Sequence, residues 1–184
     1  MQNPVEEILH KRHSLRRYAK RQPERGVIDA CLEAARIAPS AQNSQLWRFH
    51  VIDDPALRDE IALAATGGVY LPSKFIREAP VIIAALAKTD IRINRIGTFL
   101  QGVQFYLFDL GVACQQLVLR AEELGLGSCY IGWFDVDAVR RLLTVPKNEH
   151  LVCLLALGYP PEGYTLPGTH KRKELHTIAR YNRE

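Results

Sequence analysis

Apolar residues recur every three to four positions in some parts of the chain and form continuous or alternating runs in others. The first pattern predicts amphipathic helices, and the second predicts strands. Asn3 and Asp54 each precede a proline, a combination that begins helices because the side chain caps free N–H groups and proline suits the first position. The predicted helices cover residues 3–13, 23–38, 54–65, 72–78, 101–124 and a short stretch that Asp135 caps.

Four runs predict strands, at residues 47–52, 79–87, 128–134 and 150–157. Residues 79–87 are apolar without interruption, which is typical of a strand that is covered on both faces. Helices and strands follow one another without a regular β-α alternation, and the sequence contains no evident linker or repeat. The pattern therefore predicts a single domain over residues 1–184, with an α+β layer fold around a mixed sheet.

Two segments bear on subunit assembly. The predicted helix at 101–124 is apolar over most of its surface, as helices are in a core or at an oligomer interface. The segment 158–184 is rich in proline, glycine and basic residues and is long for a free loop. We expect this C-terminal tail, from about residue 159, to wrap the surface of a neighbouring subunit.

The composition is that of a globular protein, with 47% hydrophobic and 24% charged residues. The four cysteines form no C-x-x-C pair and lie in apolar surroundings, so we expect buried, reduced thiols and a cytoplasmic protein. Residues 1–7 lack the apolar core of a signal peptide. The most apolar run, residues 105–119, is too short and too interrupted to span a membrane, so we expect no membrane association.

The formal net charge is +4, and the excess is concentrated near the two ends of the chain. Such clusters could form two halves of one anion site, a solvated face or a nucleic-acid footprint. No nucleic-acid-binding motif accompanies them, so we expect no nucleic acid partner. His10 and His13 lie three positions apart, but no third ligand is evident, and we expect no metal.

The first basic cluster surrounds residues 11–18. If this segment is extended, Arg12, Ser14 and Arg16 point to one side, because strand side chains alternate. Two guanidinium groups that flank a hydroxyl suit a phosphate. The alternative is that these cations only complement the C-terminal end of the preceding helix.

A second polar group lies between a predicted helix and a predicted strand, at residues 38–47. Pro39 ends the helix, and the residues after it carry neutral amides and hydroxyls that suit the edge of a heterocycle. The alternative is a plain polar connection. The chain has no nucleophile elbow, P-loop, dinucleotide-binding glycine motif or zinc-binding histidine motif. This absence indicates that a bound cofactor carries the chemistry.

Five motifs, in this order and spacing, resemble the flavin-dependent nitroreductase family from about residue 5 to about residue 172. They are Arg12–Arg16, Ala38–Trp47, Ala79–Ile83, Gly125–Gly132 and Leu157–Pro160. The resemblance implies a mainly antiparallel central sheet flanked by helices, and a homodimer with one FMN in each of two interface clefts. It also implies ping-pong hydride transfer from NADH or NADPH to FMN and then to a small acceptor such as a nitroaromatic or a quinone.

The resemblance implies roles for individual residues. Arg12, His13 and Ser14 would hold the phosphate side of FMN, and Arg16 would lie near the pyrimidine edge of the flavin. Ile131 and Gly132 would bring backbone N–H groups near the flavin N5 atom. The other residues implied to line the ring system or close on the cofactor are Pro39, Ser40, Asn43, Lys74, His170 and Arg172. No side chain is implied to be catalytic, because the chemistry belongs to the flavin.

Three features depart from the family pattern. Leu46 stands where the family usually has proline, so we expect a looser loop before Trp47. Gly132 stands where some members carry an acidic residue, and residues 90–102 look like a shortened substrate cover. The last two features favour the alternative of a flavin-binding sensor or carrier with little turnover.

Overall fold

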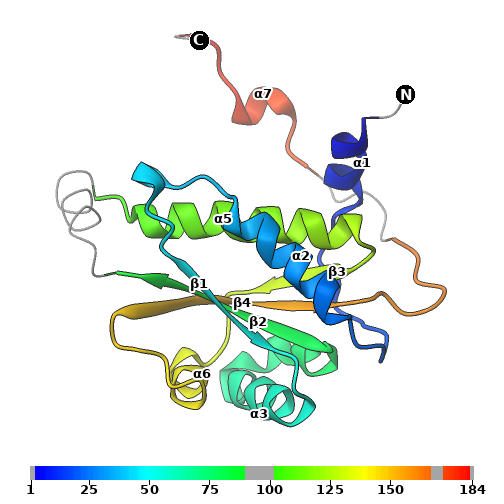
Figure 1. Ribbon diagram of the computed structural model, residues 1–184. Coiled ribbons are helices and arrows are strands. Elements are labelled where there is room, and N and C mark those ends of the chain that lie inside the picture. The colour runs from blue at the N-terminus through cyan, green and yellow to red at the C-terminus, as the bar shows by residue number, and fades with distance from the viewer. Residues whose placement is uncertain (1–2, 90–101, 167–171, 183–184) are drawn as a thin grey trace.

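The computed structural model describes residues 3–89, 102–166 and 172–182, which form a sheet between two layers of helices (Figure 1). The strands are β1 (Trp47–Ile52), β2 (Val81–Lys88), β3 (Gly127–Ile131) and β4 (Glu149–Gly158). The helices are α1 (Pro4–Lys11), α2 (Arg25–Arg36), α3 (Pro55–Ala65), α5 (Phe105–Glu123), α6 (Val136–Leu142) and α7 (Leu175–Ile178), with 3₁₀ helices η1 (Ala41–Asn43) and η2 (Gly68–Glu78).

Within the described ranges the strands form one sheet in the order β1-β2-β4-β3, and every neighbouring pair is antiparallel. The parallel component in these ranges is an isolated bridge between Ser14 and Ser128. The predicted α+β fold with a mainly antiparallel sheet flanked by helices is therefore confirmed.

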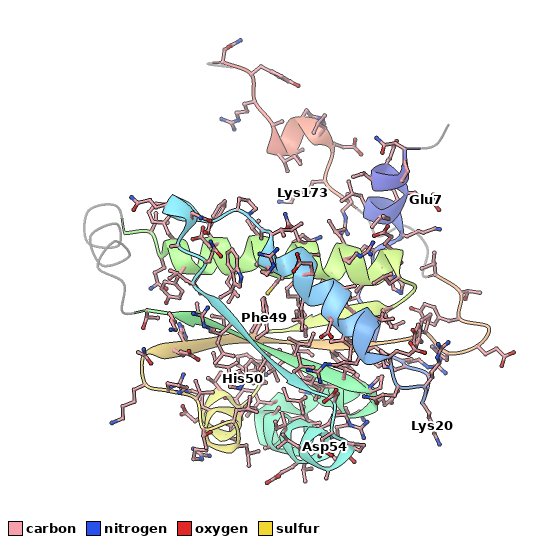
Figure 2. The ribbon with its side chains drawn as sticks, in the orientation of Figure 1. Glu7, Lys20, Phe49, His50, Asp54 and Lys173 are labelled. Carbon is pink, nitrogen blue, oxygen red and sulfur yellow. The ribbon has the colours of Figure 1, made fainter. Side chains whose placement is uncertain are left out.

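The central strand β2 supplies side chains to two separate cores. Ile83 and its neighbours on one face pack beneath α2 and α5, whereas Ile82 and its neighbours on the other face pack against α3, η2 and α6. On the adjacent strand, Phe49 lies on the side of α2 and α5, and His50 follows on the opposite side (Figure 2). Covering both faces explains the uninterrupted apolar run, and the prediction of a doubly covered strand is confirmed.

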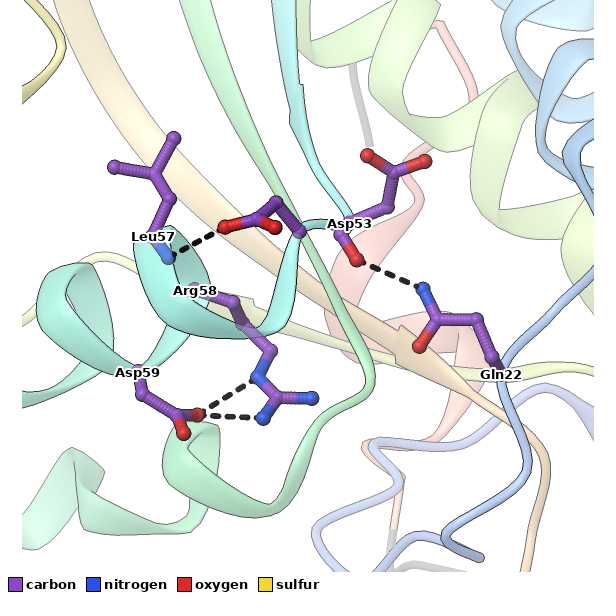
Figure 3. A network of polar contacts seen from close by, with 6 residues as sticks. Gln22, Asp53, Leu57, Arg58 and Asp59 are labelled. Carbon is purple, nitrogen blue, oxygen red and sulfur yellow. Dashed lines mark hydrogen bonds and ion pairs between the residues drawn. The ribbon is translucent and has the colours of Figure 1, made fainter.

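The predicted side-chain caps are present. Asp54 Oδ1 accepts a hydrogen bond from the Leu57 N–H at 2.9 Å and begins α3 (Figure 3). Beside this cap, Gln22 Nε2 donates to the carbonyl of Asp53 at 3.2 Å, which joins the segment before α2 to the turn between β1 and α3. Asn3 and Asp135 cap α1 and α6 in the same way.

Two predicted helix starts are wrong by a few residues. α2 begins at Arg25 rather than at Pro23, because Glu24 has extended backbone and its carbonyl accepts the first hydrogen bonds of the helix. α5 begins at Phe105, and Gly102 before it has a φ of +67°, outside helical geometry. Residue 101, where this helix was expected to begin, lies outside the described residues.

Two other elements differ in length from the prediction. The strand expected at 128–134 ends at Ile131, and the backbone then turns into the segment that leads to α6. The short helix expected at 72–78 is a 3₁₀ helix that already begins at Gly68. As a result, Gly132 lies at the end of a strand and not within it.

Two glycines allow the chain before α2 to lie directly on the sheet. A Cβ at Gly127 would lie 2.3 Å from Leu15 Cδ2, and a Cβ at Gly158 would lie 2.5 Å from Pro80 Cδ and 3.0 Å from a ring carbon of Tyr18. Only glycine permits these approaches. Tyr18 also donates its hydroxyl to the carbonyl of Leu15 at 2.6 Å. Residues 12–18 are therefore held against β3.

Apolar side chains remain exposed on α5 and in the C-terminal segment. Phe108, on the outward face of α5, is 69% exposed, and Tyr181 after α7 is 73% exposed. In Figure 1, α7 and the residues after it stand away from the three layers. Contact of this tail with a second subunit stays a prediction. Across the described ranges, every helix is too short or too polar to cross a bilayer.

Candidate functional site

Residues 12–16 run along β3, where Ser14 and Ser128 form a parallel bridge, so the extended arrangement considered in the sequence analysis is present. The Leu15 N–H donates to the Ser128 carbonyl at 2.9 Å, and the Leu15 side chain is fully buried. Side chains in extended backbone alternate, so Ser14 and Arg16 turn away from the core that Leu15 enters. The sequence reasoning that placed Arg12, Ser14 and Arg16 on one side is consistent with this geometry.

Both ring nitrogens of His13 lie within hydrogen-bond distance of groups in the same chain. Its Nδ1 lies 3.1 Å from the carbonyl of Lys11, and its Nε2 lies 3.0 Å from the hydroxyl of Tyr164. The two rings are stacked, with centroids 5.5 Å apart. Because both ring nitrogens have partners and the residue is buried, His13 positions its neighbours rather than offering a free nitrogen to a ligand. Tyr164, which fixes His13, is a residue that the sequence did not single out.

Arg12 lies near the C-terminal end of α5. It interacts electrostatically with Glu122, the second-last residue of that helix. Burial raises the pKa of Glu122, and the nearby side chains of His13, Arg12 and Lys11 oppose this rise. The half-buried guanidinium of Arg12 therefore faces a surface of mixed charge beside β3.

Arg16 connects the extended segment to η2. Its guanidinium lies 5.6 Å from the centre of the Phe75 ring, the residue after the exposed Lys74. η2 is in turn bonded to the turn after β3, because Ser73 Oγ donates to the carbonyl of Trp133 at 2.7 Å. Three separate parts of the sequence thus meet around β3.

The exposed backbone at Gly132 completes this region. Ile131 is buried at the end of β3, whereas Gly132 is exposed, and a Cβ at Gly132 would meet no atom within 4 Å. A ligand can therefore approach this backbone closely. We name the gathered residues the β3-end group: Arg12, Ser14, Arg16, Lys74 and Gly132.

The loop before β1 carries the second set of predicted residues, the loop group: Pro39, Ser40 and Asn43. Ser40 Oγ accepts a hydrogen bond from the Gln45 N–H at 3.0 Å, and Gln45 Nε2 donates to Asn43 Oδ1 at 2.8 Å. Gln42, Asn43 and Gln45 have φ values of 53°, 54° and 47°. Left-handed backbone is strained for non-glycine residues, and such strain concentrates at functional sites.

The expectation of a looser loop at Leu46 is wrong. Leu46 is 2% exposed and packs in the core beneath α2 and α5. Its carbonyl also accepts a hydrogen bond from the Lys88 N–H at 2.9 Å, which extends the pairing of β1 with β2. The long apolar side chain of Leu46 anchors the end of the loop in the core. The shorter proline ring could not reach as far into it.

Asp109 holds the loop group from below and was missed by the sequence reasoning. Its two carboxylate oxygens lie 3.2 and 3.1 Å from the Ala41 N–H, and the residue is 2% exposed. A carboxylate in an otherwise apolar helix was the available signal, because a buried charge requires a specific partner. Its partner is the backbone of the loop.

Arg12 and the loop group lie toward opposite ends of α5. Asp109, beneath the loop group, precedes Glu122, near Arg12, by thirteen positions, which is about 20 Å along a helix. Arg12 and the loop group of one chain are therefore well separated along α5. Arg172 is exposed in the C-terminal segment, and His170 lies outside the described residues.

Comparison with known proteins is consistent with these motifs. The model of the nitroreductase family matches residues 9–159. The chain is 34% identical over 181 residues to a protein of Thermus thermophilus named NADH dehydrogenase, covering 84% of this chain and 86% of the relative. It is 26% identical to an iodotyrosine deiodinase of Thermotoga neapolitana, covering 96% of each. The structure matches that of an FMN-dependent nitroreductase of Clostridium difficile with a TM-score of 0.77 and 26% identity, over 96% of this chain and 98% of the other.

Proposed function

This chain belongs to the nitroreductase family, and from that premise we propose that it is an FMN-dependent oxidoreductase. In this proposal it takes hydride from NADH or NADPH and passes it to a small organic acceptor by a ping-pong mechanism. The observation that carries the proposal is the β3-end group, in which three cations and a hydroxyl from separate parts of the chain lie along β3, with exposed backbone at Gly132 where the strand ends.

The β3-end group fits FMN in charge and in shape. Arginine forks bind phosphate oxygens with paired hydrogen bonds, so Arg12 and Ser14 suit the phosphate. Arg16 and Lys74 place positive charge beside a ring system that gains electrons. Open space above Gly132 allows a flat ring to approach the backbone. Bound FMN would supply the hydride acceptance and donation that no side chain of the chain provides.

The separation of Arg12 from the loop group supports a homodimer. In a two-fold symmetric pair, the β3-end group of one protomer can meet the loop group of the other, so that two complete sites form. The exposed apolar side chains of Phe108 on α5 and of Tyr181 in the C-terminal segment offer surface for such an assembly. We propose that His170 and Arg172 close on the phosphate from this tail.

The overall reaction needs no acid or base from the chain. With a quinone as acceptor, NAD(P)H, one proton and the quinone yield NAD(P)⁺ and the hydroquinone, which balances two electrons and two protons. The contributions of the chain are therefore binding, orientation and charge. The relative named as a deiodinase indicates that acceptors differ within this family, so the acceptor has to be inferred from this chain's own residues.

The visible absorbance spectrum of the purified protein, before and after anaerobic addition of NADH or NADPH, tests the proposal. We expect an FMN spectrum that bleaches within seconds. A flavin spectrum that neither nucleotide bleaches would contradict the enzyme and leave a flavin sensor or carrier. A colourless protein that takes up no added FMN would contradict the cofactor assignment itself.

A further inference from the structure

A tryptophan that is both exposed and fixed lies next to Gly132. Trp133 is 60% exposed. Its indole N–H donates to the carbonyl of Val69 at 3.0 Å, and its own carbonyl accepts the hydroxyl of Ser73 at 2.7 Å. Its ring lies against Tyr70, with centroids 5.4 Å apart and planes at 55°. The polar group of the indole is thus satisfied, and the exposed ring surface is held in a defined orientation.

Exposed apolar side chains and a nearby lysine surround Trp133. Val69 and Leu71, in the same part of η2, are 71% and 52% exposed. Lys74 follows the serine that bonds to the Trp133 backbone, and it too is exposed. An electron-poor ring that gains negative charge during reduction would find both a stacking surface and a nearby cation here.

We propose that Trp133, supported by Tyr70, is the stacking surface for the electron acceptor of the proposed reaction, a flat, electron-poor ring such as the quinone or nitroarene already expected. This inference rests on the proposed function, because Gly132 sets the position of the reactive ring. The electron-rich indole complements an electron-poor ring in an offset stack. A saturated or puckered acceptor of equal size would gain only burial.

The test isolates the step in which the acceptor binds. The FMN-loaded protein is reduced anaerobically with stoichiometric dithionite and mixed with menadione or with ferricyanide, while the flavin absorbance is followed. We expect Trp133→Leu to raise the apparent dissociation constant of menadione about tenfold and Trp133→Phe to change it less than about threefold. The rate with ferricyanide, which needs no stacking surface, should stay as in the wild type.

Two results of this experiment would overturn the inference. Equal menadione binding in Trp133→Leu and the wild type would show that the ring is not used. A parallel loss with ferricyanide would show that Trp133 supports the flavin or the fold instead. A wild-type protein that holds no FMN, or that neither nucleotide reduces, is a different result: it removes the proposed function and this inference with it.

A comparison on the wild type alone covers the case in which Trp133→Leu fails to fold. Benzoate and cyclohexanecarboxylate have the same charge and nearly the same size, but only benzoate is flat. We expect benzoate to compete with menadione at about a tenfold lower concentration. Equal inhibition by the two acids would contradict a stacking surface. If the exposed patch is instead covered by a second protomer, neither acid competes with menadione, which also overturns the inference.

Discussion

Arg12 and Arg17 lie five positions apart on one extended segment but differ in their surroundings. Arg12 is half-buried, belongs to the β3-end group and interacts with Glu122, whereas Arg17 is exposed. Total positive charge near the N-terminus therefore cannot identify which cation binds a ligand. The position of a cation relative to the buried Leu15 identifies it instead, because side chains alternate along the segment.

We expect Arg12→Ala to raise the dissociation constant of FMN about 10- to 100-fold, because a charge-assisted hydrogen bond is worth about 1.5–3 kcal/mol. Equilibrium dialysis of the flavin measures this constant. Arg17→Ala, which removes the same charge from an exposed position, serves as the matched control and should bind FMN as the wild type does. Equal loss in both variants would indicate a general charge effect and contradict the phosphate assignment.

Asp109 permits a second prediction at the scale of the residue. Replacing it with alanine leaves the Ala41 N–H without its acceptor, which costs about 1–3 kcal/mol of unfolding free energy. Urea denaturation measures the loss. Asp109→Asn keeps one oxygen acceptor and should lose distinctly less. If both variants unfold at the wild-type urea concentration, Asp109 does not hold the loop group.

At the scale of the element, the contact of Leu15 with Gly127 decides where the extended segment lies. A methyl group at Gly127 would have to occupy the space of the Leu15 side chain, at 2.3 Å from its Cδ2. We expect Gly127→Ala to lower the unfolding free energy by about 1–3 kcal/mol, the usual range for overpacking, and to weaken FMN binding. Thermal unfolding and flavin retention are the two measurements.

Gly26→Ala is the control for this substitution. Gly26 lies in α2, and a Cβ there would meet no atom within 4 Å. Alanine is the better helix former, so this variant should be as stable as the wild type or slightly more stable. If Gly127→Ala is as stable as Gly26→Ala, the Leu15 side chain can move aside without loss of unfolding free energy.

The sequence predicted elements best where their residues decide the structure locally. β1 was predicted to the residue, and the caps at Asn3, Asp54 and Asp135 were correct, because alternation and capping are properties of a few neighbouring positions. The left-handed residues after Ser40 were not predicted. No glycine marks them, and the Ala41 N–H that precedes them bonds to Asp109, which lies far away in the sequence.

The candidate site shows the same limit at the scale of the whole molecule. Family motifs named the residues of both groups, and the extended conformation of residues 12–16 was considered as a condition but not predicted. That Arg12 and the loop group lie near opposite ends of α5 could not be read from motif order, because it depends on the length and direction of α5. Trp133 was expected within a strand, and its exposure became evident only from the turn after Ile131.

The exposed face of α5 provides a prediction for the assembly. We expect Phe108→Lys to place a charge in the proposed interface, to yield monomers by light scattering and to lose FMN at the same time. Leu63→Lys is the matched control, since Leu63 is 62% exposed on α3 and lies outside the proposed interface. A Phe108→Lys protein that stays dimeric and yellow would contradict the proposed arrangement.

The separation of Arg12 from the loop group along α5 would, in the proposed dimer, link flavin occupancy to abundance. If each pocket draws on both protomers, keeping the flavin and keeping the partner are one coupled equilibrium. Dilution then causes the dimer to dissociate and release FMN, and added FMN favours dimerisation. The activity per protein molecule would then rise with the protein concentration. A cell that lowered the expression of this protein would therefore lose more activity than the fall in protein amount alone.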